Sequence, residues 1–280
     1  MKKWYAVIGD PISQSMSPNM HDEWFKDNNM NASYSPHHIY PEHLGEAVES
    51  LKLLGCSGWN VTVPHKSAII PFLDDIDESA EVMNAVNTVE VLPDGSLRGS
   101  NTDGAGFVQS LEEMFGQQCL EKKVLVIGAG GAARGICYGL QDKGYGPIYI
   151  ANRTIEKAQQ LAEDLPNAKA LTITKAENIL EDFGLIIQTT SVGMNYATTG
   201  MPLNPSKVLA GTVVADIIYN PLETEFLKAA RENGAQTMNG VGMFVHQGAL
   251  AFEKWTGIQP NTASMIEKIT EKLGGNYVNR

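Results

Sequence analysis

The stretch KKVLVIGAGGAARGICYGLQDKG, Lys122 to Gly144, decides the fold of the larger part of this chain. An apolar run leads into a glycine-rich turn, and a segment of helical character follows the turn. The turn fits the pattern G-x-G-x-x-G/A, with Gly128, Gly130 and Ala133 at the three small-residue positions. A strand, such a turn and a helix in this order are typical of a dinucleotide-binding βαβ unit.

Five further strand candidates follow, in the segments PIYIANR, AKALTI, GLIIQTT, TVVADII and AQTMN. Helical or loop segments separate them. Six strands in this alternation predict a complete, doubly wound Rossmann domain of the α/β class. We place this nucleotide-binding domain at residues 104–238, with a helix near 103–115 at its start.

Residues 1–103 also alternate strands with helices, which predicts a second, N-terminal α/β domain. We expect Ser17 to be the N-cap of a helix and a hairpin to turn at Asp94-Gly95. In the strand GWNVTV, Val61 and Val63 are expected to face the core, while Asn60 and Thr62 face a cleft. Two helical patterns follow residue 238, and we expect them to pack back on this first domain. The first domain would then be discontinuous, at 1–103 and 239–280.

Composition excludes several classes of protein. The formal net charge of −11 argues against a general affinity for nucleic acids or anionic membranes, and no apolar stretch of 18 residues exists to span a membrane. The three cysteines form no CxxC pair and the six histidines no HExxH pattern. We therefore expect reduced thiols, a cytoplasmic location and no metal site. The choice between a monomer and a homodimer stays open.

The second strand of the Rossmann unit ends in ANRTIEK, and this end selects the nucleotide. An NAD site usually carries an acidic residue there, which binds the ribose 2′-hydroxyl. Here the residues are Asn152, Arg153 and Thr154, with Lys157 one turn further on. A guanidinium and an ammonium attract a 2′-phosphate, so the sequence favours NADP over NAD. The six residues of the turn that would hold the pyrophosphate are Gly128, Ala129, Gly130, Gly131, Ala132 and Ala133.

The first domain carries four polar runs, each next to the end of a strand candidate. These runs are SQSMSP, NVTVPHK, AVNT and SNTDGAG. Ser15 and Ser17 precede a helix N-terminus, where hydroxyls and free N–H groups favour a carboxylate. Each run alone is compatible with turns and caps, but four of them beside a dinucleotide-binding fold indicate a substrate site.

The order of the motifs GDPISQSMSPNMH, NVTVPHK, AVNTV, GSNTDGAG, GAGGAARG, NRT, TTSVGM, DIIYNPLET and GVGMFVHQGA resembles the shikimate dehydrogenase family over nearly the whole chain. This resemblance implies NADP-dependent reduction of 3-dehydroshikimate to shikimate in aromatic amino-acid biosynthesis. Gln188 departs from the pattern, because the family often has asparagine at that position.

The resemblance also implies roles for individual residues. Lys66 and Asp103 would be the catalytic pair, and Ser15 and Ser17 would bind the substrate carboxylate. The other substrate-binding residues would be Asn60, Thr62, Asn87, Tyr219 and Gln247. The nicotinamide end of NADP would lie against Ser191, Met194, Ile217, Gly240 and Met243, and Thr189 would also bind the cofactor.

A lysine that is hydrogen-bonded to the reacting oxygen can donate a proton during reduction and accept one during oxidation. A neighbouring aspartate would hold the lysine in place. Two alternatives stay open at this point. One is a quinate/shikimate dehydrogenase that uses NAD, and the other is a catalytically silent NADP-binding regulator on the same fold.

Overall fold

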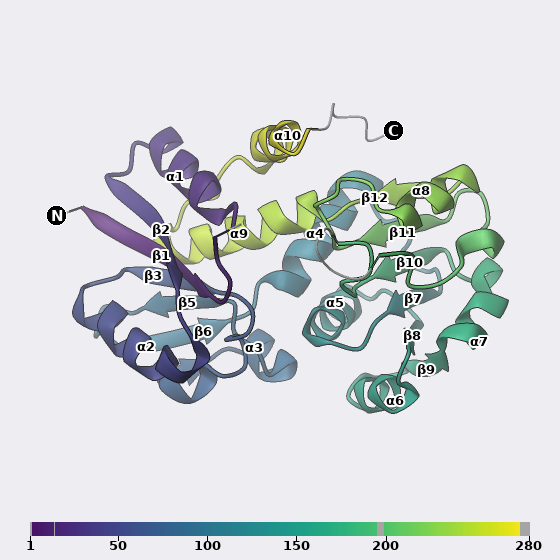
Figure 1. Ribbon diagram of the computed structural model, residues 1–280, viewed down its shortest axis with the longest axis horizontal. Helices are drawn as coiled ribbons and strands as arrows, with labels where there is room; N and C mark the ends of the chain where they lie inside the picture. Colours follow the sequence, from purple (N-terminus) through teal and green to yellow (C-terminus); the bar gives the residue numbers. More distant parts are fainter. Residues whose placement is uncertain (1, 14, 195–198, 275–280) are drawn as a thin grey trace. The chain divides into compact units, whose positions relative to one another are not determined.

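The computed structural model describes residues 2–13, 15–194 and 199–274 (Figure 1). The chain forms two compact units, Met1–Asp103 with Gln247–Met265 and Gly104–His246 with Ile266–Arg280. In the described part of the chain, each unit is built on one six-stranded sheet. Two boundaries near the C-terminus fall inside helices, between His246 and Gln247 and between Met265 and Ile266.

The sheet of the first unit has the strand order β2-β1-β3-β5-β6-β4. Strands β2 and β3 pair with β1 in parallel, and β5 pairs with β3 in antiparallel fashion. Strands β5 and β6 form the antiparallel hairpin around the turn predicted at Asp94-Gly95. The elements are β1 (Lys3–Gly9), α1 (Ser17–Asp27), β2 (Ala32–His38), α2 (Leu44–Leu53), β3 (Gly58–Val61), β4 (Asp75–Ile76), α3 (Glu78–Met83), β5 (Thr88–Val91) and β6 (Leu97–Ser100). Short 3₁₀ turns lie at Pro41–His43 and Ile70–Phe72.

Alternation along β1 distributes the core of this unit over both faces of the sheet. Ala6 and Ile8 pack in one buried cluster with residues of α2. Tyr5 points the other way, where its ring stacks on Phe25 of α1 and on Trp255, each at a centroid distance of 5.1 Å. The strand is therefore covered on both sides, which explains why its apolar run is continuous.

The second unit has six parallel strands in the order β12-β11-β10-β7-β8-β9. This is the doubly wound Rossmann order, so the predicted fold class is confirmed. The elements are α4 (Asp103–Phe115), β7 (Val124–Ile127), α5 (Gly131–Asp142), β8 (Ile148–Asn152), α6 (Ile155–Glu163), β9 (Lys169–Thr172), α7 (Ile173–Asn178), β10 (Leu185–Gln188), β11 (Val213–Asp216), α8 (Glu225–Glu232) and β12 (Gln236–Met238). Further 3₁₀ turns lie at Leu180–Asp182 and Pro205–Lys207.

Helices cover both faces of this parallel sheet. Alternate residues of β7, Val124 and Val126, pack with α4 and α5, while Leu125 and Ile127 pack in a second cluster with α7 and α8. Every residue of β7 is buried, as in β10 and β11. Burial on both faces is the physical reason for the short, unbroken apolar runs in the sequence.

Two C-terminal helices complete the chain, α9 (Val241–Thr256) and α10 (Thr262–Lys272). Residues 247–256 of α9 pack on the first unit: Trp255 Nε1 donates to the carbonyl of Val89 at 3.0 Å. Gly248 lies over Met20, whose methyl group would be 2.2 Å from a Cβ at that position. In the second unit, His246 Nε2 lies 2.6 Å from Glu113 Oε2 of α4.

Two local expectations are wrong. Helix α1 begins at Ser17 itself, and Met16 is its N-cap. Strand β3 ends at Val61, and Val63 is 67% exposed instead of facing the core. The His65 N–H donates to the Thr62 carbonyl at 3.0 Å, which closes a turn there and ends the alternation.

Each helix in the described part of the chain is too short or too polar to span a bilayer.

Candidate active site

A lysine and an aspartate form the centre of the candidate site in the first unit. Lys66 lies in the turn region after β3, and Asp103 is the first residue of α4. Lys66 Nζ donates to Asp103 Oδ2 at 2.6 Å, and the two side chains are 29% and 13% exposed. Such a distance is that of a charge-assisted hydrogen bond, and the lysine keeps access to solvent.

Asn87 holds the other oxygen of this carboxylate. Its Nδ2 donates to Asp103 Oδ1 at 2.8 Å, and its Oδ1 accepts the backbone N–H of Thr102 at 3.0 Å. A backbone N–H can only donate, so this contact fixes which end of the Asn87 amide faces Asp103. Both oxygens of Asp103 therefore accept a hydrogen bond from a nitrogen, and the carboxylate is held from two sides.

Two further residues of the predicted substrate site, Gln247 and Asn60, bond to residues beside this pair. Gln247 Oε1 lies 3.5 Å from Asn87 Nδ2, and Gln247 accepts the Thr102 hydroxyl at its carbonyl at 2.9 Å. Asn60 is buried and donates to the Asn87 carbonyl at 3.1 Å. Thr62 is half-buried against Gly9, where a Cβ would lie 2.4 Å from its methyl group. The structure thus brings predicted polar residues of four separate sequence motifs together.

The two predicted carboxylate ligands lie at the start of α1. Ser17 is 9% exposed, and its backbone N–H donates to Ser15 Oγ at 3.3 Å. The Ser17 side chain makes no capping bond, because the helix starts one residue earlier than expected. No hydrogen bond among the described residues joins these serines to the Lys66–Asp103 cluster.

In the second unit, the glycine-rich turn has the shape that a pyrophosphate requires. Gly128 has φ 115°, and a Cβ there would lie 2.4 Å from Thr189 Oγ1. A Cβ on Gly130 or Gly131 would meet no atom within 4 Å, so the surface in front of the turn is open. Helix α5 starts at this point without a side-chain cap. Its first N–H groups are therefore free for an anion, and the residues fit a dinucleotide.

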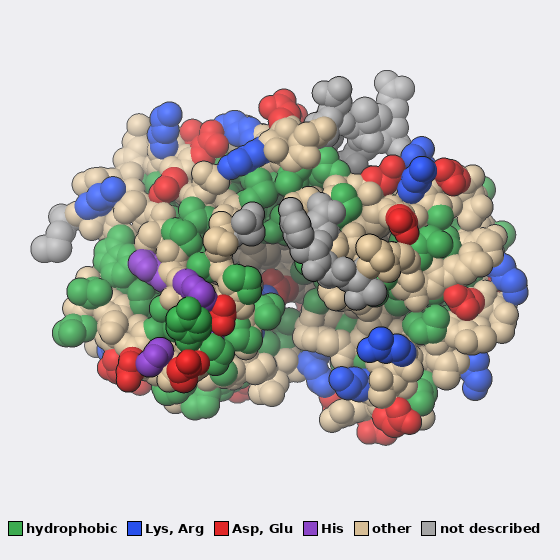
Figure 2. All heavy atoms as spheres, in the orientation of Figure 1, with side chains coloured by type: hydrophobic (Ala, Val, Ile, Leu, Met, Phe, Trp, Pro, Cys, Tyr) green, Lys and Arg blue, Asp and Glu red, His purple; other side chains and the backbone are tan. Residues whose placement is uncertain are grey.

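The predicted 2′-phosphate ligands lie where β8 passes into α6. Arg153, Thr154 and Lys157 are exposed, and Asn152 is half-buried with its Nδ2 donating to the Thr154 carbonyl at 2.8 Å. Within the described residues, neither Arg153 nor Lys157 takes part in an ion pair. Figure 2 shows basic side chains gathered over the region of α5 and α6. Unpaired cations here fit a phosphate better than a bare ribose hydroxyl.

The residues predicted for the nicotinamide end follow β10, β11 and β12. Gly240 packs against the chain after β11 so closely that a Cβ would lie 2.0 Å from the Ile217 carbonyl oxygen. Thr189 donates from its hydroxyl to the Ile127 carbonyl at 2.7 Å, which ties the loop after β10 to the glycine-rich turn. The ring centroids of Tyr219 and Phe244 lie 5.0 Å apart. Met243 is buried, whereas Ser191 and Met194 are exposed.

Two buried residues outside the predicted site shape these loops. Gln188 and Asp216 end β10 and β11 and are partners in register, each with no exposed surface. Gln188 accepts the Thr190 N–H at 2.7 Å and donates to the Val192 carbonyl at 2.9 Å. The signal in the sequence was a polar residue that closes a buried strand, in LIIQ and in VVAD.

Asp216 fixes the chain that carries Ile217 and Tyr219. Its Oδ1 accepts the Ile218 N–H at 2.9 Å, and its Oδ2 accepts the Thr224 hydroxyl at 2.8 Å. Burial raises the pKa of this carboxyl to about 7, and the two hydrogen bonds partly oppose the rise. The charge of the Asp216 carboxyl group therefore changes with pH near neutrality.

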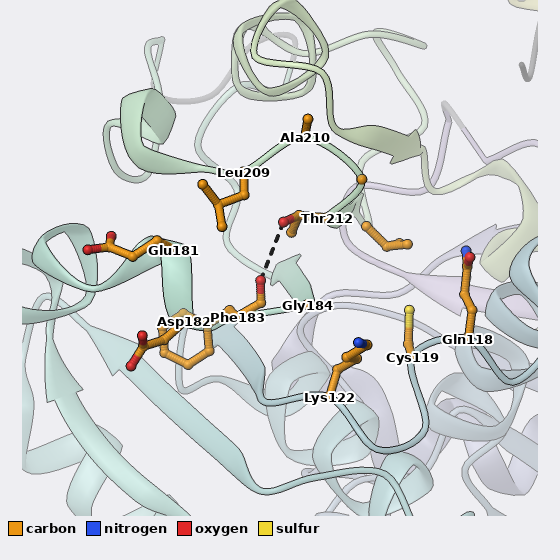
Figure 3. Close-up of a pocket in the computed structure, with 12 residues that line it drawn as sticks. Gln118, Cys119, Lys122, Glu181, Asp182, Phe183, Gly184, Leu209, Ala210 and Thr212 are labelled. Carbon is orange, nitrogen blue, oxygen red and sulfur yellow. Dashed lines mark hydrogen bonds between the residues drawn. The ribbon is translucent and has the colours of Figure 1, made fainter.

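A separate hollow of about 520 Å³ lies in the second unit (Figure 3). It is lined by the residues that precede β10 and β11, among them Gly184 and Thr212, together with Gln118, Cys119 and Lys122. None of the predicted site residues lines it. Among the described residues, no group of three or more His, Cys, Asp or Glu side chains is arranged to hold a metal ion.

Comparison with known proteins agrees with this geometry. Family models match residues 7–89 (shikimate dehydrogenase substrate binding domain), 110–217 (shikimate/quinate 5-dehydrogenase) and 240–270 (shikimate 5′-dehydrogenase C-terminal domain). The chain is 52% identical to the shikimate dehydrogenase (NADP(+)) of Lysinibacillus sphaericus, over 99% of this chain and 100% of that one.

Solved structures show the same likeness. A shikimate dehydrogenase in complex with NADP+ superposes with a TM-score of 0.91 at 39% identity, and covers 97% of this chain and 96% of its own. The quinate dehydrogenase of Corynebacterium glutamicum in complex with NAD superposes with a TM-score of 0.89 at 29% identity, over 96% and 99%. By the family models and by its full-length relatives, this chain belongs to the shikimate dehydrogenase family.

Proposed function

We propose that this chain catalyses the reversible, NADPH-dependent reduction of 3-dehydroshikimate to shikimate, a step of aromatic amino-acid biosynthesis. Membership of the family supports this reaction. The single structural observation that carries it is the contact of 2.6 Å between Lys66 Nζ and Asp103 Oδ2, with Asn87 on the other carboxylate oxygen. A silent regulator on this fold would not need such a pair.

In this proposal, bound NADPH supplies the hydride, and the protein supplies orientation and the proton. Lys66 hydrogen-bonds to the reacting oxygen, gives it a proton during reduction and takes one back during oxidation. Asp103 holds the lysine head in place through its Oδ2. Because the Lys66 side chain is 29% exposed, water can restore the proton after each turnover.

The substrate is held in the first unit. Ser15 and Ser17 bind the carboxylate near the N-terminus of α1, where the helix dipole and free N–H groups favour a negative charge. The ring hydroxyls contact the polar cluster around Lys66. The residues of the first unit proposed for these contacts are Asn60, Thr62, Asn87 and Gln247. The resemblance adds Tyr219, which belongs to the second unit.

NADP is held in the second unit, by its pyrophosphate at the turn Gly128–Ala133 and by its 2′-phosphate at Asn152, Arg153, Thr154 and Lys157. The open space in front of Gly130 and Gly131 and the unpaired cations at the end of β8 support this placement. The nicotinamide end is assigned to Ser191, Met194, Ile217, Gly240 and Met243, and Thr189 is assigned to the cofactor site. The functional division into 1–103 with 239–280 and 104–238 stays a prediction, and residues 275–280 lie outside the described part of the chain.

One experiment separates this function from its rivals. The absorbance of the reduced nicotinamide is followed on adding shikimate or quinate, with NADP and with NAD, and kcat/KM is compared for the four pairs. We expect the highest value for shikimate with NADP. A higher value for quinate with NAD would favour a quinate/shikimate dehydrogenase, and no absorbance change with any pair would favour a regulator.

We propose a cytoplasmic location, because Cys56, Cys119 and Cys137 are all free and buried. Burial raises the pKa of the Cys137 thiol to about 12, so this thiol stays protonated and unreactive. A monomer or a homodimer fits the proposed function equally, and light scattering of the purified protein decides between them.

A further inference from the structure

Tyr34 is a buried tyrosine of β2 that lies one layer behind the candidate active site. Its side chain is 4% exposed, and its hydroxyl donates to Asn60 Oδ1 at 2.7 Å. The ring is stacked on His21 at a centroid distance of 4.4 Å and an interplanar angle of 8°. Its backbone N–H donates to Asp22 Oδ1 at 2.8 Å. The hydroxyl is thus held in one place by the packing of the ring and of the strand.

The direction of the hydrogen bond from Tyr34 is fixed by the groups beyond it. Asn60 Nδ2 donates to the backbone carbonyl of Asn87 at 3.1 Å, and a carbonyl can only accept. Asn60 Oδ1 is therefore the end that faces Tyr34, and the tyrosine has to be the donor. Burial raises the pKa of Tyr34 well above its ordinary value, so the donor proton stays on the hydroxyl.

From Asn60 the hydrogen bonds continue to the catalytic aspartate. Asn60 Nδ2 lies 3.2 Å from Thr88 Oγ1, and the fully buried Thr88 hydroxyl donates to Asn87 Oδ1 at 2.8 Å. Asn87 Nδ2 then donates to Asp103 Oδ1 at 2.8 Å. Each link has one possible direction, so the chain from Tyr34 to Asp103 is a single ordered network within the first unit.

We propose that Tyr34 is a positioning residue for the proposed reaction. Its hydroxyl orients the Asn60 amide, and through Thr88 and Asn87 it helps to hold Asp103 beside Lys66. Loss of the hydroxyl leaves a buried amide oxygen without its donor, which frees the Asn60 amide to turn. This inference rests on the proposed function, because it assigns Asp103 and Lys66 to catalysis.

The test replaces the hydroxyl alone, with Tyr34→Phe. We expect kcat/KM for shikimate to fall about tenfold, in kcat more than in the KM for NADP, because one buried hydrogen bond is lost. The matched control is Tyr145→Phe. Tyr145 is also 4% exposed, and its hydroxyl has no partner among the described residues, so this change should leave kcat unaltered.

A double-mutant cycle separates positioning from a general loss of stability. If Tyr34 acts through Asn60, Tyr34→Phe lowers kcat no further in an Asn60→Ala background. An undiminished tenfold loss in that background, or wild-type kcat in Tyr34→Phe alone, would overturn the inference.

A second measurement does not depend on turnover. In the ¹⁵N spectrum of the full chain, the side-chain amide signals of Asn60 and Asn87 should both shift in Tyr34→Phe and stay unchanged in Tyr145→Phe. An unmoved Asn87 signal would overturn the relay to Asp103. An inactive wild-type enzyme with shifted signals would instead contradict the proposed function alone.

Discussion

At the scale of single residues, Lys66 combines a fixed position with access to solvent. Its ammonium is fixed at 2.6 Å from a carboxylate that is itself held by Asn87, yet its side chain keeps contact with solvent. A surface ion pair would be too mobile to orient a proton donor, and a fully buried pair would have no route for proton exchange. The half-buried geometry suits a group that has to release and recover a proton in every cycle.

Replacement of this lysine should remove turnover without removing binding. We expect Lys66→Ala to lower kcat by about 100-fold to 10,000-fold, the usual contribution of general acid–base catalysis, with a much smaller change in the KM for shikimate. Lys254→Ala is the control, because Lys254 is a lysine of the same unit whose partners are Asp77 and Glu90. Near-normal turnover of Lys66→Ala in steady-state assays would refute the catalytic role.

Arg153 should determine the choice of nucleotide. A guanidinium that binds a 2′-phosphate contributes to NADP affinity and not to NAD affinity, so Arg153→Ala should raise the KM for NADP about 10-fold to 100-fold and leave the KM for NAD nearly unchanged. Lys143→Ala, at the exposed C-terminal end of α5, serves as the control for loss of a positive charge. Equal changes in both KM values would mean that Arg153 is only a surface charge.

At the scale of elements, the sequence predicted what local patterns control. The runs VLVI, LIIQ and VVAD became fully buried parallel strands, and the hairpin turned where Asp94-Gly95 placed it. The end of β3 at Val61 was missed, because a turn closed by the His65 N–H sets it and alternation carries no sign of that contact.

The resemblance to the family selected the polar residues of the site, but not those that support them. Gln188 and Asp216 are opposite each other only because β10 and β11 pair in this register, and the Tyr34 hydroxyl donates to Asn60 from a different strand. Such contacts depend on strand order and register in the folded sheet. A single sequence shows the buried polar residue but not its partner.

Two glycines of the second unit should respond in opposite ways to the same added methyl group. In α4, a Cβ on Gly104 would lie 2.1 Å from the backbone oxygen of Gly135 in α5, so Gly104→Ala has to push two helices apart and should cost about 3 kcal/mol of unfolding free energy. Gly130→Ala meets no protein atom and should leave stability unchanged, but it should weaken NADP binding by filling the space in front of the turn. Urea unfolding and NADP titration of both variants give the four values needed. If Gly130→Ala lost stability, the backbone conformation at position 130 would require glycine, and the open space in front of the turn would not be the reason for it.

At the scale of the whole molecule, the two units carry buried titratable groups with opposite pKa shifts. Burial among aromatic rings lowers the pKa of His21, in the first unit, to about 3. Burial raises the pKa of Asp216, in the second unit, to about 7. The unfolded chain protonates His21 near pH 6.5, so the stability contributed by a neutral His21 is complete above that pH and is lost as the pH falls. The folded chain keeps Asp216 protonated up to about pH 7, so its contribution is complete below the unfolded pKa of 3.8 and is lost as the pH rises.

As the pH rises from about 4 to 6.5, the unfolding free energy of the first unit should therefore increase by about 1.4 kcal/mol per pH unit through His21. The unfolding free energy of the second unit should decrease by a similar amount through Asp216. All four tryptophans lie in the first unit, so tryptophan fluorescence follows its unfolding in urea; they are Trp4, Trp24, Trp59 and Trp255. Peptide-resolved hydrogen exchange in β7 and β10, corrected for the pH dependence of chemical exchange, follows the second unit.

The variants His21→Phe and Asp216→Asn isolate the two contributions, and each is the control for the other. His21→Phe keeps an aromatic ring in the stack and should flatten the pH slope of the fluorescence transition only. Asp216→Asn keeps an acceptor for the Ile218 N–H and should flatten the exchange slope only. If one variant changed both pH slopes, the two units would unfold as a single cooperative system. If a variant left the slope of its own unit unchanged, a group other than the replaced residue would cause the pH dependence of that unit.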